Sequence, residues 1–207
     1  MKDTKALILQ VAIELFRNDG FEHVSVDMIC EKCGISKGAF YHHFKAKGNL
    51  LTEYLATMAP HHLSLINDII DISDPVEQLW TLIMIYVENS RVLGPDLVKH
   101  MWISDIEAGN ELLTPFVIYS TGPLRGLNEL ILKVIESGQK VGHIDTGATA
   151  DDLLFSFTSA LMGLCATWAA KGGGFDYDKE LRRIFAAIFR VPNTMSVKIP
   201  LPPVSGQ

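Results

Sequence analysis

Cysteine is scarce in this chain: its 207 residues include only three, and an odd number cannot pair completely. That usage fits a reducing compartment better than a disulfide framework. A secretory leader is not expected either, because Gln10 and Glu14 interrupt the apolar stretch near the first residue. We therefore expect a cytoplasmic protein.

The sequence also lacks the motifs of common enzymes. No serine stands in a G-x-S-x-G setting, and the glycine run at 171–174 has neither the spacing nor the Ser/Thr of a phosphate-binding loop. Runs of alternating polar and apolar residues, which mark half-buried strands, are missing as well. These absences predict a protein that is not an enzyme, needs no cofactor or metal and contains no sheet.

Net positive charge is missing from the chain as a whole, whose formal charge is -6. On its own this value argues against a nucleic-acid partner. The negative charge is distributed unevenly, however. Residues 1–50 hold seven Lys/Arg and six Asp/Glu, whereas residues 51–207 hold eleven Lys/Arg and eighteen Asp/Glu. Residues 32–52 contain four lysines and no acid. A local basic patch matters more for phosphate binding than the overall balance does.

Helical periodicity is present nearly throughout, so we predict an all-α fold. Pro60 is expected to kink or split one long helix. The predicted organisation is an N-terminal three-helix domain at 1–47, a second helical domain at 48–191 and a proline-rich, extended or disordered tail at 192–207. Glycine and proline positions place the helices at about 5–18, 26–33, 37–44, 47–70, 75–93, 95–108, 111–138, 148–170 and 178–190.

The stretch MICEKCGISKGAFYHHFKAK, residues 28–47, contains a C-x-x-C pair followed by two histidines. Adjacent helical residues point about 100° apart, so His42 and His43 cannot readily complete a zinc site with both cysteines. Cys30 and Cys33 instead fall on the apolar stripe of their own helix, where a free cysteine behaves as a small hydrophobe. Packing is the favoured interpretation, and a redox or metal role is the alternative.

The helix expected at 37–44 has two different faces. At about 100° per residue, Phe40 and Phe44 turn toward the core, while small, polar and basic residues turn outward. Small residues let a backbone approach a groove wall, and phenol, imidazole and ammonium groups can reach phosphates or base edges. Because a tight turn links this helix to the short one before it, the pair predicts a helix-turn-helix that binds DNA.

Three consecutive patterns occupy this region: A-x-x-L-F-x-x-x-G-F at 12–21, S-V-x-x-I at 25–29 and G-I-S-K-G-x-F-Y-x-H-F at 34–44. Together they make residues 8–51 resemble the N-terminal domain of the TetR (tetracycline-repressor) family of bacterial transcriptional regulators. The resemblance implies DNA contacts, mainly to phosphates and with the two small residues near bases, from Ser25, Lys37, Gly38, Ala39, Tyr41, His42, His43 and Lys47.

Two positions depart from the usual pattern of that family. Cys30 and Cys33 stand where alanine is usual, which supports the packing interpretation. Gly48 stands where an acid is common, which predicts a looser start of the following helix.

The resemblance further implies that the second domain binds a small effector and forms a homodimer on a palindromic DNA operator. Aromatic and methionine side chains are scattered over its predicted helices, as expected of a pocket between helices for an apolar or aromatic ligand. The residues expected to line this pocket are Trp80, Met84, Trp102, Phe116, Tyr119, Phe155 and Met162.

The run at 153–170 has no charged residue and approaches the length that can span a bilayer. Acidic Asp151 and Asp152 precede it and no second span exists, so we expect no membrane partner. A helix that is apolar on all sides is instead covered by its own domain and by a partner. With the helix at 178–190 it predicts a four-helix dimer interface formed by Leu153, Phe157, Leu161, Leu164, Trp168, Leu181, Ile184, Phe185 and Ile188.

The resulting prediction is a homodimeric DNA-binding regulator, a repressor that a small effector releases from its operator. The alternative is a thiol- or metal-responsive regulator that acts through Cys30 and Cys33.

Overall fold

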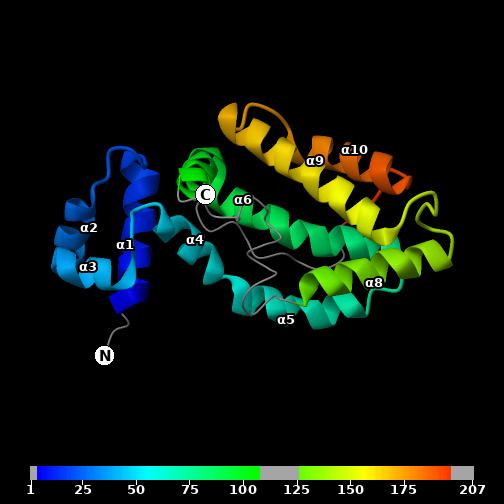
Figure 1. The fold of residues 1–207 in the computed structure, drawn as a ribbon, viewed down its shortest axis with the longest axis horizontal. Helices are drawn as coiled ribbons and strands as arrows, with labels where there is room; N and C mark the ends of the chain where they lie inside the picture. Colours follow the sequence, from blue (N-terminus) through cyan, green and yellow to red (C-terminus); the bar gives the residue numbers. More distant parts are fainter. Residues whose placement is uncertain (1–3, 108–125, 197–207) are drawn as a thin grey trace.

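The computed structural model describes residues 4–107 and 126–196, and every regular element in these two ranges is a helix. The all-α prediction is therefore confirmed for them. The helices are α1 Thr4–Asp19, α2 Val26–Cys33, α3 Lys37–His43, α4 Asn49–Ala56, α5 Ala59–Ile70, α6 Pro75–Glu107, α8 Leu127–Lys140, α9 Ala150–Ala170 and α10 Tyr177–Phe189. Figure 1 shows α1–α3 as a small lobe, which α4 joins to a larger lobe formed by the remaining helices.

Local capping explains the two short helices of the small lobe. The hydroxyl of Ser25 accepts a hydrogen bond from the Met28 N–H at 3.2 Å and begins α2, and the hydroxyl of Ser36 accepts from the Ala39 N–H at 3.2 Å and begins α3. Gly34 ends α2 with φ at 67°, a conformation that glycine adopts without a Cβ penalty. The tight turn between α2 and α3 follows directly from these residues.

The small lobe closes on one apolar core. Ile8 and Phe16 from α1 and Phe40 from α3 are at most 2% exposed. The ring of Phe40 packs against that of Phe44, with centroids 5.7 Å apart. Burial of side chains of this size stabilises a fold by about 1.5–3 kcal/mol each. One face of α3 is therefore fixed in the core, and the opposite face lies at the surface.

Gly48 begins α4 at a close contact with the larger lobe. A Cβ added to Gly48 would lie 2.1 Å from the side-chain oxygen of Ser104 on α6, so only glycine fits this approach. Gly48 provides no side-chain cap for α4, so the looser helix start stays a prediction, and the residue has the additional role of allowing this close packing. Pro60 stands in the first turn of α5, and the predicted split of the long helix is confirmed.

α6 runs through the centre of the larger lobe and is broken at Gly94, whose φ of 77° and ψ of 165° are not helical. Pro95 follows the break, as the sequence predicted. The helix packs against α5, α8 and α9 on its way (Figure 1). The predicted helix at 111–138 is described from Leu127 onward as α8, and its residues 111–125 lie outside the described ranges.

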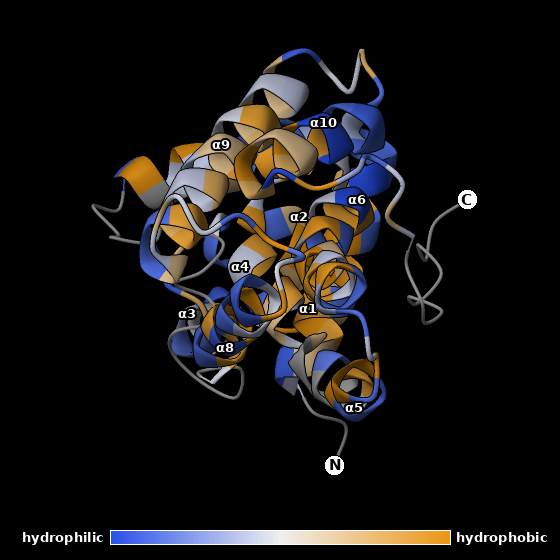
Figure 2. Cartoon of the chain, turned by 90° about the vertical axis from the view of Figure 1, so that its right-hand side faces the viewer, coloured by the Kyte–Doolittle hydropathy of each residue, from blue (hydrophilic) through white to orange (hydrophobic). Residues whose placement is uncertain are grey.

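α9 and α10 form an antiparallel pair at the outer edge of the larger lobe (Figures 1 and 2). α9 is long and apolar enough to qualify as a membrane span by length and hydropathy. It nevertheless buries one stripe of side chains in the core of its own lobe, where the ring of Phe157 meets those of Phe185 and Phe189. Figure 2 shows apolar residues on the outward side of α9 as well.

The residues that follow α10 are attached to the larger lobe. The guanidinium of Arg182 donates to the carbonyl of Met195, whose side chain is 5% exposed, and the Ser196 N–H donates to a carboxylate oxygen of Glu77 at 2.8 Å. The first residues of the predicted tail therefore belong to the fold, and residues 197–207 lie outside the described ranges.

Candidate nucleic-acid interface

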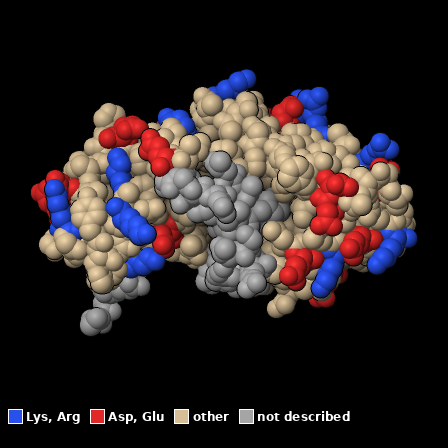
Figure 3. Space-filling model, in the orientation of Figure 1, with Lys and Arg blue, Asp and Glu red and all other residues tan. Residues whose placement is uncertain are grey.

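The outward face of α3 carries the side chains that the sequence placed there. Tyr41, His42 and His43 are exposed, with Tyr41 at 54%, and Gly38 is exposed beside them. The imidazoles of His42 and His43 contact each other edge to face, with centroids 5.1 Å apart. Figure 3 shows lysine and arginine side chains on the small lobe, with acidic groups interspersed. α3 thus presents a small, polar and partly basic surface on a rigid support.

Lys37 stands at the first position of α3 and pairs with Asp27 of α2 at 2.7 Å. Both side chains are mostly exposed, at 60% and 64%. The hydrogen bond and the negative charge of Asp27 raise the pKa of Lys37, so this ammonium is fully charged at neutral pH. Since an exposed pair of this kind contributes little to stability, a phosphate can replace Asp27 as its partner at small cost.

Lys47 has an internal role that the sequence did not indicate. Its ammonium donates to the carbonyls of Phe21 at 2.7 Å and of Val24 at 2.9 Å, and it lies 4.2 Å from the ring centroid of Phe21. Partial burial lowers its pKa. An ammonium has three N–H donors, and two are used here. The side chain thus holds the loop between α1 and α2, and the phosphate contact expected at Lys47 stays a prediction that its third N–H could serve.

Ser25 is exposed, and its cap of α2 is compatible with the DNA contact predicted for it. Its oxygen caps α2 by accepting from Met28, which leaves the hydroxyl hydrogen available as a donor. The half-buried Ala39 lies on α3 next to exposed Gly38. Of the eight predicted DNA contacts, seven therefore lie on or next to the outward surface of α2 and α3, and Lys47 lies behind it.

The cysteines of the C-x-x-C pair pack inward, as their helical spacing predicted. Cys30 is 5% exposed, Cys33 is half-buried, and both thiols are free. Burial raises the pKa of both thiols, which reduces the thiolate fraction that redox chemistry needs. In the described parts of the chain no group of three or more metal-ligating side chains comes together. The arrangement gives the thiol- or metal-responsive alternative no support.

The residues predicted to line an effector pocket do not form one set. Trp80 and Met84 lie buried on α6, and Met162 and Trp102 are half-buried on α9 and on the second half of α6. Phe155 is 74% exposed on α9, so its assignment to the pocket needs correction. Phe116 and Tyr119 lie outside the described residues.

The residues predicted for a dimer interface divide into two groups. Leu164, Trp168, Ile184 and Ile188 are half-buried. The other five side chains have almost no exposed surface and pack within their own lobe, and the predicted interface as a whole stays a prediction. These five are Leu153, Phe157, Leu161, Leu181 and Phe185, all at most 6% exposed.

A contact between the two lobes was missed by the sequence reasoning. The guanidinium of Arg17 on α1 donates to the carbonyl of Val92 on α6 at 2.9 Å, and the ring of Phe21 stacks on His100 of α6 with centroids 4.6 Å apart. The residues of each pair are more than 70 positions apart. No local signal in one sequence reports such pairs.

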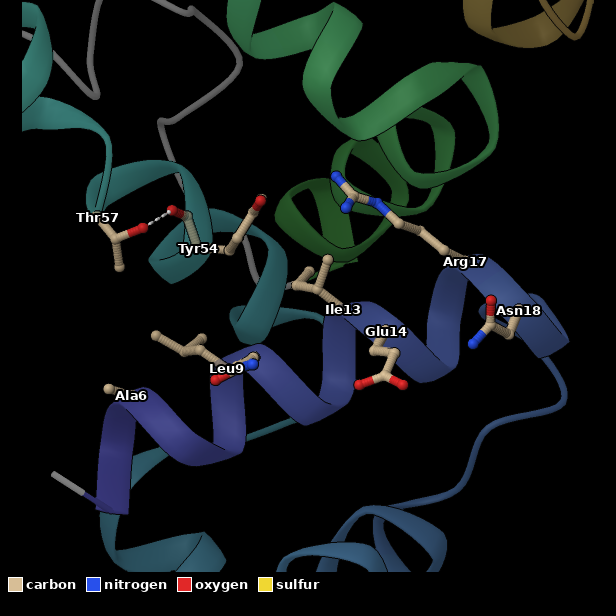
Figure 4. Close-up of a pocket in the computed structure, with 9 residues that line it drawn as sticks. Ala6, Leu9, Ile13, Glu14, Arg17, Asn18, Tyr54 and Thr57 are labelled. Carbon is tan, nitrogen blue, oxygen red and sulfur yellow. Dashed lines mark hydrogen bonds between the residues drawn. The ribbon is translucent and has the colours of Figure 1, made fainter. Parts of the chain in front are cut away.

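A groove of about 470 Å³ lies between α1 and α4, beside this contact (Figure 4). Leu9 and Ile13 lie along α1 on the side that faces α4, and Tyr54 and Thr57 approach from α4 and its end. Arg17 stands at one end of the groove and extends toward α6. The groove is open and mixed in polarity, and none of the predicted effector residues lines it.

Comparison with known proteins identifies the region that contains α1–α3. Residues 8–54 match the family model described as bacterial regulatory proteins, tetR family. An uncharacterized HTH-type transcriptional regulator of Bacillus subtilis, YerO, is 36% identical over 94 residues, which are 44% of this chain and 32% of YerO. The match thus spans about a third of that relative.

Two further similarities extend over most of the chain. The HTH-type transcriptional repressor KstR2 of Rhodococcus jostii is 23% identical over 188 residues, which are 87% of each protein. The structure of FadR from Thermus thermophilus, a TetR family repressor in complex with lauroyl-CoA, superposes with a TM-score of 0.63 at 19% identity and covers 96% of this chain and 98% of FadR. At that identity the likeness concerns the fold.

Proposed function

We propose that the chain is a homodimeric repressor that a small effector releases from DNA, because residues 8–54 match the family model described as bacterial regulatory proteins, tetR family. The observation that carries this proposal is the division of α3 into two faces. Phe40 is fully buried, while Tyr41 and the two histidines beside it are exposed in a segment without acids. Residues 1–47 form the reading domain in this proposal, and residues 48–191 form the effector-binding and dimerisation domain.

α3 acts as the recognition helix. A helix of this kind lies in the major groove with small residues against the groove wall and polar groups at base edges. Gly38 and Ala39 allow the close approach, and Tyr41 and His42 supply donors and acceptors. Lys37, Ser25 and His43 bind phosphates around this centre, which fixes the orientation of the helix on the duplex.

Dimerisation uses the outward side of α9 and α10. Among the described residues Phe155 is the most exposed large apolar side chain, at 74%. Ile184 and Ile188 extend the apolar surface on α10. An apolar surface at the edge of a helical pair is what a two-fold related copy can cover. The second copy provides the second recognition helix, so the operator is a palindrome.

The effector is a small apolar or aromatic molecule that binds in the larger lobe near Trp80 and Met84. The likeness to FadR, described with bound lauroyl-CoA, supports an effector site in a fold of this kind. Release requires that the effector bind one arrangement of the two reading domains more tightly than the other. The cytoplasm, where the DNA lies, is the proposed location.

Selection of bound DNA from a random pool tests the proposal. We expect enrichment of a palindrome whose half-sites lie about 34–36 Å apart or at a multiple of that distance. A screen for small molecules that release this DNA then identifies the effector. Failure to enrich any palindrome would contradict the proposed function.

A further inference from the structure

Phe21 contacts both Lys47 and His100 at the boundary of the two lobes. The ammonium of Lys47 lies 4.2 Å from its ring centroid. Its ring is nearly parallel to that of His100, with an interplanar angle of 18° and a centroid distance of 4.6 Å. Phe21 belongs to the loop between α1 and α2, and His100 belongs to α6, so this stack joins the reading domain to the larger lobe.

Two carboxylates surround the same imidazole. The Nδ1 atom of His100 lies 3.3 Å from a carboxylate oxygen of Glu22, and its Nε2 atom lies 3.6 Å from a carboxylate oxygen of Asp96. The His100 side chain is only 7% exposed, although those of Glu22 and Asp96 are largely exposed. His100 therefore contacts two consecutive residues of the loop, one through its ring face and one through a ring nitrogen.

The loop held in this way determines where α2 and α3 lie. It ends at Ser25, the cap of α2, and Lys47 ties its carbonyls at Phe21 and Val24 to the start of α4. A displacement of Phe21 thus displaces the beginning of α2, and α3 moves with α2 because the two pack together.

Parts of α1 and α4 are separated by the groove of about 470 Å³, with Arg17 at one end of it (Figure 4). At the other end of α1, Lys5 pairs with Glu53 of α4 at 2.6 Å. The contacts of α1 and its loop with α6, which are Arg17 to Val92 and Phe21 to His100, lie at the opposite end of α1 from Lys5. They are well placed to set the angle between the lobes.

We propose that His100, which stacks on Phe21 and pairs with Glu22, is a positioning residue for DNA recognition that sets the angle at which α3 is presented. This inference rests on the proposed function. His100 does not touch DNA in this arrangement; it acts through the loop at Phe21 and Glu22. Its loss changes how well the two recognition helices match the spacing of the operator half-sites.

The experiment compares three variants with a control on the same helix. His100→Ala removes the stack and the contacts with Glu22 and Asp96, His100→Phe keeps an aromatic ring without its nitrogens, and Glu22→Gln weakens the contact from the loop side. Glu107→Gln is the control, because Glu107 is exposed at the end of the same helix, about two turns beyond His100. Each protein is titrated with the selected operator and with versions whose spacer is one base pair longer or shorter.

We expect His100→Ala to bind the operator about fivefold or more weakly, at the lower end of typical coupling between sites, and to lose the preference for the native spacer. His100→Phe should keep part of the operator affinity and of the spacer preference, and Glu22→Gln should lose an intermediate amount of each. The control should match the wild type. The slope of log affinity against log salt stays unchanged, because no phosphate contact is removed.

Unchanged affinity and spacer preference in both His100→Ala and Glu22→Gln would overturn the inference, as would a salt slope reduced by about 0.9, which indicates a direct phosphate contact. If His100→Ala does not fold, Glu22→Gln decides, since its side chain is 73% exposed. Should the wild type select no DNA, the proposed function fails. Hydrogen exchange of the backbone amides at residues 20–26 still tests whether His100 holds the loop. The exchange must be faster in His100→Ala and in Glu22→Gln than in the wild type.

Discussion

The ammonium of Lys47 donates a hydrogen bond to the carbonyl of Phe21, a residue 26 positions earlier, at 2.7 Å. Together with its bond to Val24, this contact makes Lys47 part of the scaffold of the small lobe. Lys37 offers the contrast, because its ammonium reaches only the exposed carboxylate of Asp27. The two lysines at the ends of the same basic segment therefore have different roles, and different measurements distinguish them.

Lys47→Ala should destabilise the protein by about 1–3 kcal/mol, because two partly buried carbonyls lose a charged donor. Lys37→Ala should leave the unfolding midpoint unchanged. Urea unfolding followed by circular dichroism measures both, and it requires no DNA. Equal midpoints for the two variants would show that the internal contacts of Lys47 are not important for stability.

Lys37→Ala should instead reduce the salt dependence of DNA binding, with the slope of log affinity against log salt smaller by about 0.9. Fluorescence anisotropy at several salt concentrations provides this slope. The exposed Asn18→Ala on α1 is the control and should behave as the wild type. A slope identical to that of the wild type would remove Lys37 from the DNA surface.

Tyr41→Ala and His42→Ala should each weaken binding to the selected operator by about tenfold without lowering thermal stability, since both side chains are exposed. If a side chain reads a base, its loss should also relax the preference at one operator position. Binding to a set of single-base operator variants measures this. Equal losses on all sequences would assign the side chain to phosphates.

Phe155→Glu should convert the proposed dimer into a monomer, weakening association by roughly a hundredfold or more, because the substitution acts twice at a symmetric interface. Val141→Glu is a matched control: Val141 is 58% exposed at the end of α8, away from the proposed interface. Analytical ultracentrifugation measures the dissociation constants. A dimer retained in Phe155→Glu and lost in Val141→Glu would place the interface elsewhere.

Gly163 provides an independent test of the same interface. A Cβ at this position meets no other atom of the described chain within 4 Å, so Gly163→Ala should stabilise an isolated subunit by about 1 kcal/mol through helix propensity. If α9 of a second subunit approaches closely, the added methyl group instead weakens the dimer. Opposite signs for the monomeric Phe155→Glu background and the native dimer are the expected result.

The three thiols should react slowly with a thiol reagent in the native protein, because burial raises the pKa of Cys30, Cys33 and Cys165. All three should react at once after unfolding in guanidinium chloride. Spectrophotometric titration compares the two states. Rapid native labelling accompanied by loss of DNA binding would revive the thiol-responsive alternative.

Glu88 should make stability depend on pH. Its side chain is 3% exposed, and burial raises its pKa above the ordinary value of 4.5, against the opposing effect of Arg91. A raised folded-state pKa gives stability that is full below 4.5 and is lost as pH rises through the folded value. The unfolding free energy of Glu88→Gln minus that of the wild type should therefore increase with pH above 4.5. A constant difference would contradict this sign.

The small lobe could be predicted from the sequence because its signals are local. Ser25 and Ser36 begin helices, Gly34 ends one, and the spacing of Phe40 and Phe44 identifies the buried face of α3. Each of these features depends on residues within a few positions of one another. The same reasoning predicted that Cys30 turns inward.

The faces of α9 could not be separated in the same way. Every residue from Leu153 to Ala170 is uncharged. The exposed side holds mainly small or weakly polar residues, Ser156, Ser159, Gly163 and Thr167, which mark a surface less clearly than charges do. Phe157 and Phe155 have the same chemistry in the sequence, yet one is fully buried and the other is 74% exposed. Only the position of α10 and α6 decides which of them faces the core.

Contacts between distant segments were equally inaccessible. The resemblance to the TetR family implied a DNA contact for Lys47, and nothing in the sequence reports that its flexible side chain turns back to Phe21. The stack of Phe21 on His100 depends on how two lobes meet.

Gly94 explains how α6 offers a backbone acceptor to Arg17 of the small lobe. The last four carbonyls of a helix have no partner within it, and the break at Gly94 ends the first half of α6 just after Val92, the residue whose carbonyl binds Arg17. The backbone angles of Gly94 are essentially restricted to glycine. One residue without a side chain therefore frees the Val92 carbonyl in the middle of α6. In an uninterrupted helix that carbonyl would instead accept an intrahelical hydrogen bond.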